Sequence, residues 1–251
     1  MRRPTLSPSK ITTFLACPNK YLWTYVDSRG KWYLKAKSYY SFGTTLHKVL
    51  ERFHDSGDAG VTTVGDALQA YEESWIDAGY ASQEEMQEAF GEGREIILAT
   101  LSDERVAERK AKVLAVEKLL KYNMGDFDLV GRIDRIDEHE DGTLEIIDYK
   151  SGRSTVTDSE VETDLAMAIY QLLIARTFPD KPYRATIHAL RSNSTGSAAL
   201  SRQEIDQLEQ DILILGTQIL STSIEDVLPK VKPLCADCDF LALCKKNPDY
   251  N

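Results

Sequence analysis

Apolar side chains recur at helical spacing in several stretches of the chain. The first helix is predicted from about Ser9, with Ile11, Phe14 and Leu15 on its apolar face. Ser7 or Ser9 can cap this helix, and Pro18 should kink or restart it. The other predicted helices cover 41–55, about 65–78, 83–110 and 163–177, and a further one begins near Ser201.

Between these helices lie shorter stretches in which apolar and polar residues follow a strand pattern. They predict strands at 112–122, 128–137, 144–149 and 183–190. The tail from 223 onward contains proline and cysteine and should lack long regular structure. Because helices and strands are mixed along one chain, the pattern predicts an α/β fold class.

The second and third strands predict a hairpin that carries acids. Residues 140–142 fit a three-residue loop with Gly142 in the left-handed conformation, which pairs His139 with Thr143 and sets Asp134 opposite Asp148. A two-residue loop would shift the register by one and send the two acids to opposite faces. In the preferred register two like charges oppose each other, which is destabilising unless something neutralises them.

A divalent cation would neutralise these carboxylates, and oxygen ligands favour Mg²⁺ or Mn²⁺. Lys150 lies two residues beyond Asp148, so both side chains point to the same face of the strand. There the lysine can contact a scissile phosphate or orient the attacking water. A cation and a lysine together make a site for phosphodiester hydrolysis.

The four cysteines form a second candidate site. They are one isolated residue and a C-x₂-C-x₅-C cluster: Cys17, Cys235, Cys238 and Cys244. The start of the chain has no apolar stretch typical of a secretory signal, so structural disulfides are not expected. The spacing leaves zinc and an iron–sulfur cluster open.

Charge and hydropathy narrow the class of protein. The net charge of −10 argues against a sequence-independent nucleic-acid coat, although 29–37 mixes basic and aromatic residues that suit phosphates and stacked bases. No apolar run approaches the ~20 residues that span a bilayer. A cytoplasmic location and no membrane partner are therefore expected.

The motifs resemble the RecB-like branch of the PD-(D/E)XK nucleases. The resemblance rests on "LSPSKITTFLACP", "FGTTLHKVLE", "AVEKLL", "GRIDRID" and "IIDYKSG", and so extends over nearly the whole chain. It implies a restriction-endonuclease-like core, a mixed sheet flanked by helices. The implied organisation is an N-terminal helical region at 1–111, the nuclease core at 112–222 and a cysteine-bearing tail at 223–251.

The resemblance also implies roles for individual residues. His47, Asp134 and Asp148 would bind the metal, with the carbonyl of Tyr149 as a further ligand. Lys150 would be the catalytic lysine. Glu117, from the first strand, would act through a water, and Glu51 would support His47 from the next helical turn.

One position departs from the pattern of this branch. A Gln-x-x-x-Tyr motif is expected on the helix after the Asp-x-Lys strand, and here Gln171 is followed by Ala175 where the tyrosine would be. Gln171 is retained as a residue of the site or of the DNA contact. Tyr170 is the nearest replacement for the missing tyrosine.

The cysteine pattern resembles that of the iron–sulfur RecB-like nucleases, which include the CRISPR-associated Cas-four family. This resemblance implies a [4Fe–4S] cluster held by the four cysteines, clamping the tail onto the first helix. A zinc-stabilised structural protein is the alternative that the spacing alone leaves open.

The resulting functional hypothesis is a Mg²⁺- or Mn²⁺-dependent deoxyribonuclease, an exonuclease acting on single-stranded DNA or DNA ends. Recombination, repair and CRISPR adaptation would all use this chemistry. The chain has no G-x-x-x-x-G-K-[ST] loop, so a helicase or a CRISPR integration partner would have to supply unwinding. A non-catalytic DNA-binding or assembly subunit with the same fold is the alternative.

Overall fold

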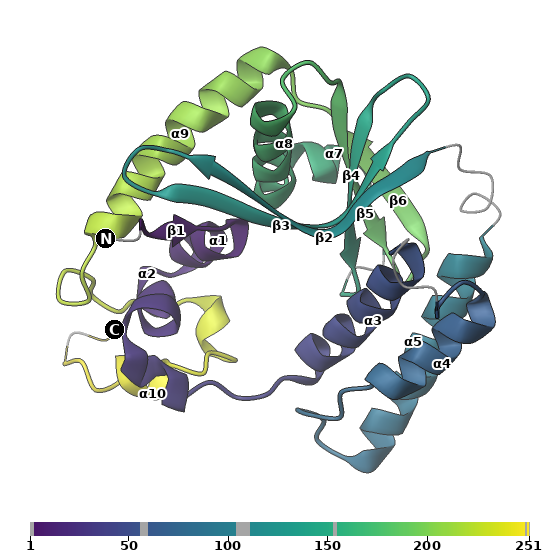
Figure 1. Ribbon diagram of the computed structural model, residues 1–251. Helices are drawn as coiled ribbons and strands as arrows, with labels where there is room; N and C mark the ends of the chain where they lie inside the picture. Colours follow the sequence, from purple (N-terminus) through teal and green to yellow (C-terminus); the bar gives the residue numbers. More distant parts are fainter. Residues whose placement is uncertain (1–2, 56–59, 104–110, 153–154, 249, 251) are drawn as a thin grey trace.

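The computed structural model describes residues 3–55, 60–103, 111–152, 155–248 and 250. Its centre is a mixed sheet in the order β1-β3-β4-β5-β6, with β2 pairing with the other edge of β3 (Figure 1). The strands are β1 (Thr5–Leu6), β2 (Lys112–Asn123), β3 (Asp128–Glu138), β4 (Leu144–Lys150), β5 (Tyr183–Ala189) and β6 (Ser194–Ala198). The predicted α/β class and the restriction-endonuclease-like core, a mixed sheet flanked by helices, are confirmed.

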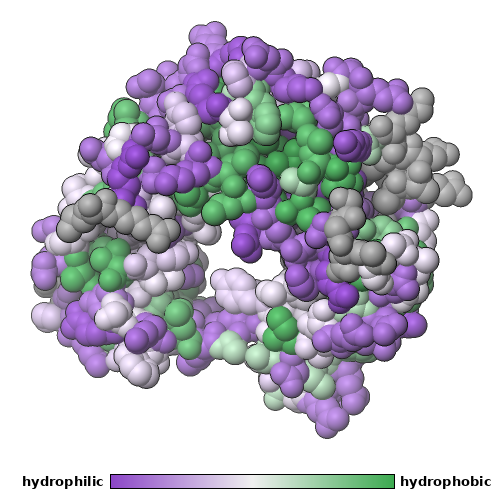
Figure 2. Space-filling model, in the orientation of Figure 1, coloured by the Kyte–Doolittle hydropathy of each residue, from purple (hydrophilic) through white to green (hydrophobic). Residues whose placement is uncertain are grey.

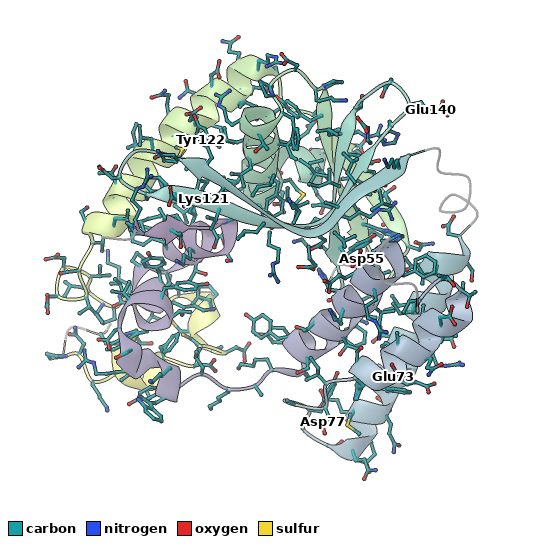
Figure 3. The ribbon with its side chains drawn as sticks, in the orientation of Figure 1. Asp55, Glu73, Asp77, Lys121, Tyr122 and Glu140 are labelled. Atoms are coloured by element: carbon teal, nitrogen blue, oxygen red, sulfur yellow. The ribbon has the colours of Figure 1, made fainter. Side chains whose placement is uncertain are left out.

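The β3–β4 hairpin has the predicted three-residue loop. His139 donates its backbone N–H to the Thr143 carbonyl at 3.0 Å, and Gly142 adopts φ +83°, a conformation that glycine tolerates best. Glu140 lies at the tip of this loop (Figure 3). The hairpin register follows from this turn, with Glu138 paired with Leu144.

Strands β4 and β5 run parallel, and such a pair needs a crossover connection. Two helices provide it, α7 (Asp158–Thr163) and α8 (Leu165–Thr177), where a single helix from 163 was predicted. The break occurs at Asp164, whose side chain accepts the N–H groups of Ala166 and Met167 and so caps a new helix.

Helices cover both faces of the sheet (Figure 1). On one face α1 (Pro8–Ala16), α8 and α9 (Arg202–Ser221) contribute to an apolar cluster that includes Ile11, Leu172 and Ile212. The other cluster joins α3 (Ser38–His54), α4 (Val64–Ser74) and α5 (Gln83–Ser102) to Ile147 and Tyr149 of β4. Six of the seven residues of β4 are therefore buried, as expected for a strand covered on both faces.

Most sequence-based element boundaries agree with the structure. Ser7 caps α1, and Pro18 restarts the chain as α2 (Pro18–Tyr21), as predicted. The helix predicted at 65–78 ends at Ser74, and the ring of Trp75, the next residue, stacks on that of Tyr80. The helix predicted at 83–110 ends at Ser102, and the remainder of that range, 104–110, lies outside the described residues.

Two strands, β1 and β6, were missed because neither has a detectable pattern. β1 contains two residues, and β6 consists of small polar residues in the sequence STGSA. The tail lacks long regular structure, as predicted, and its longest helix among the described residues is α10 (Leu241–Cys244). No helix that the structure describes is long and apolar enough to cross a membrane.

Candidate metal centre and cysteine cluster

The sheet brings three acids into one row across β2, β3 and β4. Val116 pairs with Arg135 and Lys118 with Ile133, so Glu117 lies beside Asp134. On the other edge of β3 the pairing with β4 ends at Arg135 and Ile147, and the next residues of the two strands are Asp134 and Asp148. This is the register that the three-residue loop predicted.

The side chain of Asp134 continues the hydrogen bonding between β3 and β4 beyond their last backbone pair. Its Oδ2 accepts the backbone N–H of Tyr149 at 2.9 Å. Tyr149 itself is 5% exposed, and its ring packs edge-on against the ring of His47. The acid row is therefore fixed by backbone contacts and does not depend on exposed, mobile side chains.

Helix α3 supplies the histidine of the site. His47 Nδ1 lies 3.3 Å from Asp134 Oδ2. The helix approaches the end of β4 closely, because a Cβ added at Gly43 would lie 2.9 Å from the Ser151 hydroxyl oxygen. A glycine at this position therefore lets His47 reach the acids.

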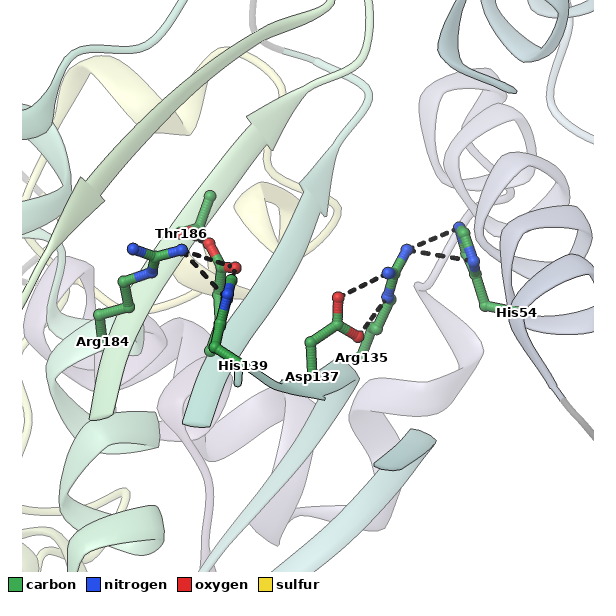
Figure 4. Close-up of polar contacts among 7 residues, drawn as sticks. His54, Arg135, Asp137, His139, Arg184 and Thr186 are labelled. Atoms are coloured by element: carbon green, nitrogen blue, oxygen red, sulfur yellow. Dashed lines mark hydrogen bonds and ion pairs between the residues drawn. The ribbon is translucent and has the colours of Figure 1, made fainter. Parts of the chain in front are cut away.

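A buried arginine contacts the C-terminal end of α3. Arg135 of β3 forms an ion pair with Asp137 at 2.5 Å and places Nη1 2.9 Å from Nε2 of His54, the last residue of the helix (Figure 4). A second network in the same view joins Glu145 to His139, Arg184 and Thr186. These paired charges lie on the strands beside the site and hold them in fixed positions.

His47, Glu117 and Asp134 form a candidate metal site. Each offers one ligand atom, and these atoms lie within 4.8 Å of one another. An imidazole and two carboxylates suit a divalent cation such as Mn²⁺ or Mg²⁺. Glu117 has φ +46°, a strained conformation for a residue with a Cβ, and such strain tends to occur at functional sites.

Asp148 and Lys150 form a pair next to this group. Lys150 Nζ lies 2.6 Å from Asp148 Oδ2, so the two side chains share a face as predicted. Burial raises the pKa of Asp148 to about 6; the lysine opposes this shift, and the Asp134 charge adds to it. Of the described residues, Asp148 lies outside the group of three whose ligand atoms approach within 4.8 Å.

The electrostatics of the group indicate an excess of negative charge. Burial and the Asp134 carboxylate raise the pKa of Glu117. Burial alone would lower the pKa of His47, but the hydrogen bond and charge of Asp134, with Asp148 and Glu117, raise it overall. A bound cation would stabilise the deprotonated forms of all these groups.

His47, Glu117 and Asp134 line a cleft of about 810 Å³. Figure 2 shows the molecule hollowed at its centre, with an opening between its parts. The lining includes Arg132 and Lys150 on the sheet side and Tyr39 and Tyr40 at the start of α3. Glu51, predicted to support His47, also lines the cleft and pairs with Lys48 at 2.8 Å.

The two tyrosines were not identified from the sequence. Their only signal in the sequence was the adjacent Tyr-Tyr pair, which lies just before the helix predicted at 41–55. Side-chain exposure could not be read from that pattern, because helical spacing alone does not say which face meets solvent.

Helix α8 presents Tyr170, not Gln171, to the acids. Gln171 is 1% exposed, and its side-chain oxygen accepts the backbone N–H of Leu200 at 2.9 Å. The buried Gln171 side chain therefore contacts the segment that leads into α9. The Tyr170 ring lies over Gly131 of β3, where an added Cβ would come within 3.0 Å of it. The pKa of Tyr170 is raised by burial and by the charges of Asp148 and Asp134.

All four cysteines gather around one cavity. Cys17 follows α1, while the other three come from the tail. Together the four line one pocket, with Phe240 and Leu241 among the other lining residues. Burial and the other three sulfurs raise the pKa of Cys244 to about 11. Thiolates this close together repel one another, which contributes to this raised pKa. A metal bound between them would stabilise the thiolate forms.

A hydrogen bond to one cysteine sulfur and several contacts of the tail help to hold the four cysteines together. The backbone N–H of Lys232 donates to Cys235 Sγ at 3.4 Å, and the Lys232 ammonium donates to the Ala16 carbonyl at 2.6 Å. Lys37, just before α3, forms an ion pair with Asp239 at 3.3 Å. The tail therefore contacts both the first helix and the segment that leads to α3.

A sheet flanked by helices, with acids, a histidine and a lysine at one cleft, is the architecture of a metal-dependent nuclease. The model of the PD-(D/E)XK nuclease superfamily matches residues 5–245. The chain belongs to this superfamily. Its members use divalent metals and act on nucleic acid, so DNA is the class of substrate that the fold implies.

Two solved structures are similar to the chain. A "Putative exonuclease" from Eubacterium rectale is 14% identical over 84% of this chain and 91% of that one, with a TM-score of 0.40. SSO0001 is 15% identical over 98% of this chain and 88% of that one, with a TM-score of 0.35. No curated protein matches the chain.

Proposed function

We propose that the protein is a Mg²⁺- or Mn²⁺-dependent exonuclease that hydrolyses single-stranded DNA from an end. The observation that carries this proposal is the group of His47, Glu117 and Asp134 within 4.8 Å, directly beside the Lys150–Asp148 pair and facing one cleft. A carboxylate–imidazole set with an adjacent lysine matches the needs of phosphodiester hydrolysis.

In this proposal each residue has a defined role. His47, Glu117 and Asp134 hold the cation, with Asp148 and the Tyr149 carbonyl as further ligands. When bound, the cation polarises the phosphate and lowers the pKa of the attacking water. Lys150 orients that water or neutralises the phosphate, and its pKa, which Asp148 raises against the effect of burial, keeps it charged at neutral pH.

The shape of the site supports a single strand as substrate. Glu117 and Asp134 line a cleft, and Figure 2 shows the molecule hollowed at its centre. A strand that enters such a hollow by its end is degraded from that end. Unwinding of a duplex would then fall to a partner, a helicase or a CRISPR integration complex, in recombination, repair or adaptation.

The four cysteines are proposed to hold a [4Fe–4S] cluster. Their convergence on one cavity and the N–H···S bond to Cys235 support a thiolate-bound centre. Metal analysis of anaerobically purified protein separates this cluster from zinc, because a cluster is brown and contains iron while a zinc centre is colourless.

The test is cleavage of end-labelled single-stranded DNA with Mn²⁺, with Mg²⁺ and with EDTA. The wild-type protein should shorten the strand progressively with either metal and leave it intact with EDTA. Asp134→Ala and Lys150→Ala should each lower the rate at least about 100-fold. The first removes a ligand of the cation that polarises the phosphate, and the second removes the positive charge beside that phosphate.

Lys181→Ala is the matched control, because Lys181 pairs with Glu138 away from the cleft. It should keep the wild-type rate. Full activity of both site variants would refute the assignment. A wild-type protein that binds the strand but never cleaves it, with its cluster intact, would indicate the non-catalytic DNA-binding subunit.

A further inference from the structure

Two exposed tyrosines face the cleft that holds the candidate metal site. Tyr39 and Tyr40 are 61% and 65% exposed, and their ring centroids lie 4.4 Å apart at an interplanar angle of 49°. Both rings line the same cleft as His47, Glu117 and Asp134. The metal site as proposed does not use either of them.

Helix α3 fixes the spacing between the rings and the metal site. Tyr40, Thr44, His47 and Glu51 follow one another at steps of three and four residues, which places them on one face of the helix, and all four line the cleft. Seven residues separate Tyr40 from His47, about 10 Å along the helix axis.

The rest of the cleft can follow a DNA backbone. Arg132 lies 3.4 Å from Glu117 with 68% of its side chain exposed, and Lys48 on α3 is 53% exposed beside Glu51. Lys150 lies deeper, at the acid row. Cations on both walls can accompany phosphates, while the aromatic faces are the part of the lining suited to bases.

We propose that Tyr39 and Tyr40 form a stacking platform for bases of the single DNA strand, about 10 Å along α3 from the metal-site histidine. The inference rests on the proposed nuclease function and adds the residues that hold the strand. Stacking on an aromatic face does not depend on base identity, so the platform suits an enzyme that degrades any sequence. It also favours single strands over duplex, because paired bases already stack on one another.

A structural role for the pair is the competing explanation. Tyr39 also faces the tail, since the charges of Asp239 and Asp237 contribute, after burial and Tyr40, to the raised pKa of its hydroxyl. If the rings served only to position α3 against the tail, their removal would weaken binding of every strand equally, with or without bases.

The experiment therefore varies the tyrosines and the bases together. Binding is measured by fluorescence anisotropy in EDTA, with a labelled oligothymidylate and with the same backbone carrying abasic sites. Tyr39→Ala/Tyr40→Ala should weaken binding of the oligothymidylate about 10- to 100-fold, the usual effect of removing a stacked base contact. It should bind the abasic strand as the wild-type protein does.

Two control variants complete the design. Tyr39→Phe/Tyr40→Phe keeps the aromatic faces and should bind within about twofold of wild type. Tyr25→Ala removes a tyrosine that is 40% exposed and packs against Tyr21 outside the cleft lining, and it should have no effect.

The inference is overturned if the double alanine variant binds oligothymidylate normally, if it loses the abasic strand equally, or if the phenylalanine variant fails in the same way. The nuclease function is judged separately, from cleavage of the oligothymidylate by wild-type protein with Mn²⁺. A wild-type protein that cleaves while its alanine variant binds normally would refute the platform and leave the nuclease assignment intact.

Discussion

At the scale of single residues, the candidate metal site is electrostatically unfavourable without a cation. Glu117 combines a left-handed backbone conformation with a raised pKa, and Asp134 beside it contributes to that shift. A carboxyl whose folded pKa exceeds its unfolded value binds protons more tightly when folded. Its contribution to stability is therefore lost as pH rises from the unfolded value through the folded one.

Glu117→Gln should consequently stabilise the metal-free protein, and more so at pH 8 than at pH 4.5. The wild-type carboxyl is more ionised at pH 8 than at pH 4.5, and its ionised form repels Asp134, whereas the amide is neutral at both pH values. Thermal unfolding in EDTA measures the difference. Added Mn²⁺ should reverse the order, because the wild-type protein binds it more tightly and gains stability by mass action.

Glu140→Gln is the control for this prediction, since Glu140 lies at the tip of the β3–β4 hairpin (Figure 3). Its unfolding temperature should follow that of the wild-type protein with and without metal. If Glu117→Gln is less stable than wild type in EDTA at pH 8, repulsion at the acid row is not the dominant effect.

At the scale of elements, α3 determines whether the site is assembled. The helix carries His47 and the exposed tyrosines, and two contacts hold it in place: the close approach of Gly43 to Ser151 and the contact of His54 with Arg135. The apolar face of the helix, including Leu46 and Val49, packs into the cluster shared with Tyr149.

Gly43→Val should lower Mn²⁺ affinity at least about tenfold while α3 remains helical. A Cβ here would lie 2.9 Å from the Ser151 hydroxyl oxygen, and the valine methyl groups reach further than the Cβ. We expect this crowding to push α3 away from the end of β4 and to carry His47 from Asp134. Isothermal titration with Mn²⁺ measures the loss, and circular dichroism verifies the helix content.

Gly91→Val provides the matched control in another helix. A Cβ at Gly91 would meet no atom within 4 Å, and the residue lies inside α5. Both substitutions place valine in a helix interior, so a drop in Mn²⁺ affinity of the same size in each would mean that the close approach is not responsible.

At the scale of the whole molecule, the C-terminal tail packs against the N-terminal part of the chain. Cys17 lies near the start of the chain and the other three cysteines near its end, and the tail also contacts Ala16 and Lys37. A centre bound by all four sulfurs would restrain a loop of about 220 residues, and loop closure of this kind disfavours the unfolded chain.

Cys17→Ser should therefore abolish iron binding and lower the unfolding temperature by about 5 °C or more. Trypsin should also cut the tail faster, since its lysines would no longer be held near the first helix. Iron analysis, thermal unfolding and timed proteolysis, all under anaerobic conditions, measure the three effects.

Lys232→Ala tests the tail without removing a ligand. It breaks the hydrogen bond to Ala16 but leaves every sulfur in place, so colour and iron content should be retained. An unchanged iron content in Cys17→Ser would exclude the four-cysteine centre.

The sequence by itself determined the local features. Helical spacing and capping located α1, α3 and α9, and the glycine-containing loop fixed the hairpin register that sets Asp134 beside Asp148. These features depend on residues close together in the chain, whose effects are local. The motifs that resemble the RecB-like branch indicated the superfamily that residues 5–245 match.

Tertiary structure decided which distant residues meet. Glu117 joins His47 and Asp134 because β2 pairs along β3 with Glu117 left-handed, and Gln171 turns to Leu200 while Tyr170 faces the acids. The exposure of Tyr39 and Tyr40 depends equally on what α3 packs against. Such contacts arise only when the sheet and its helices pack together, so no local pattern in the sequence encodes them.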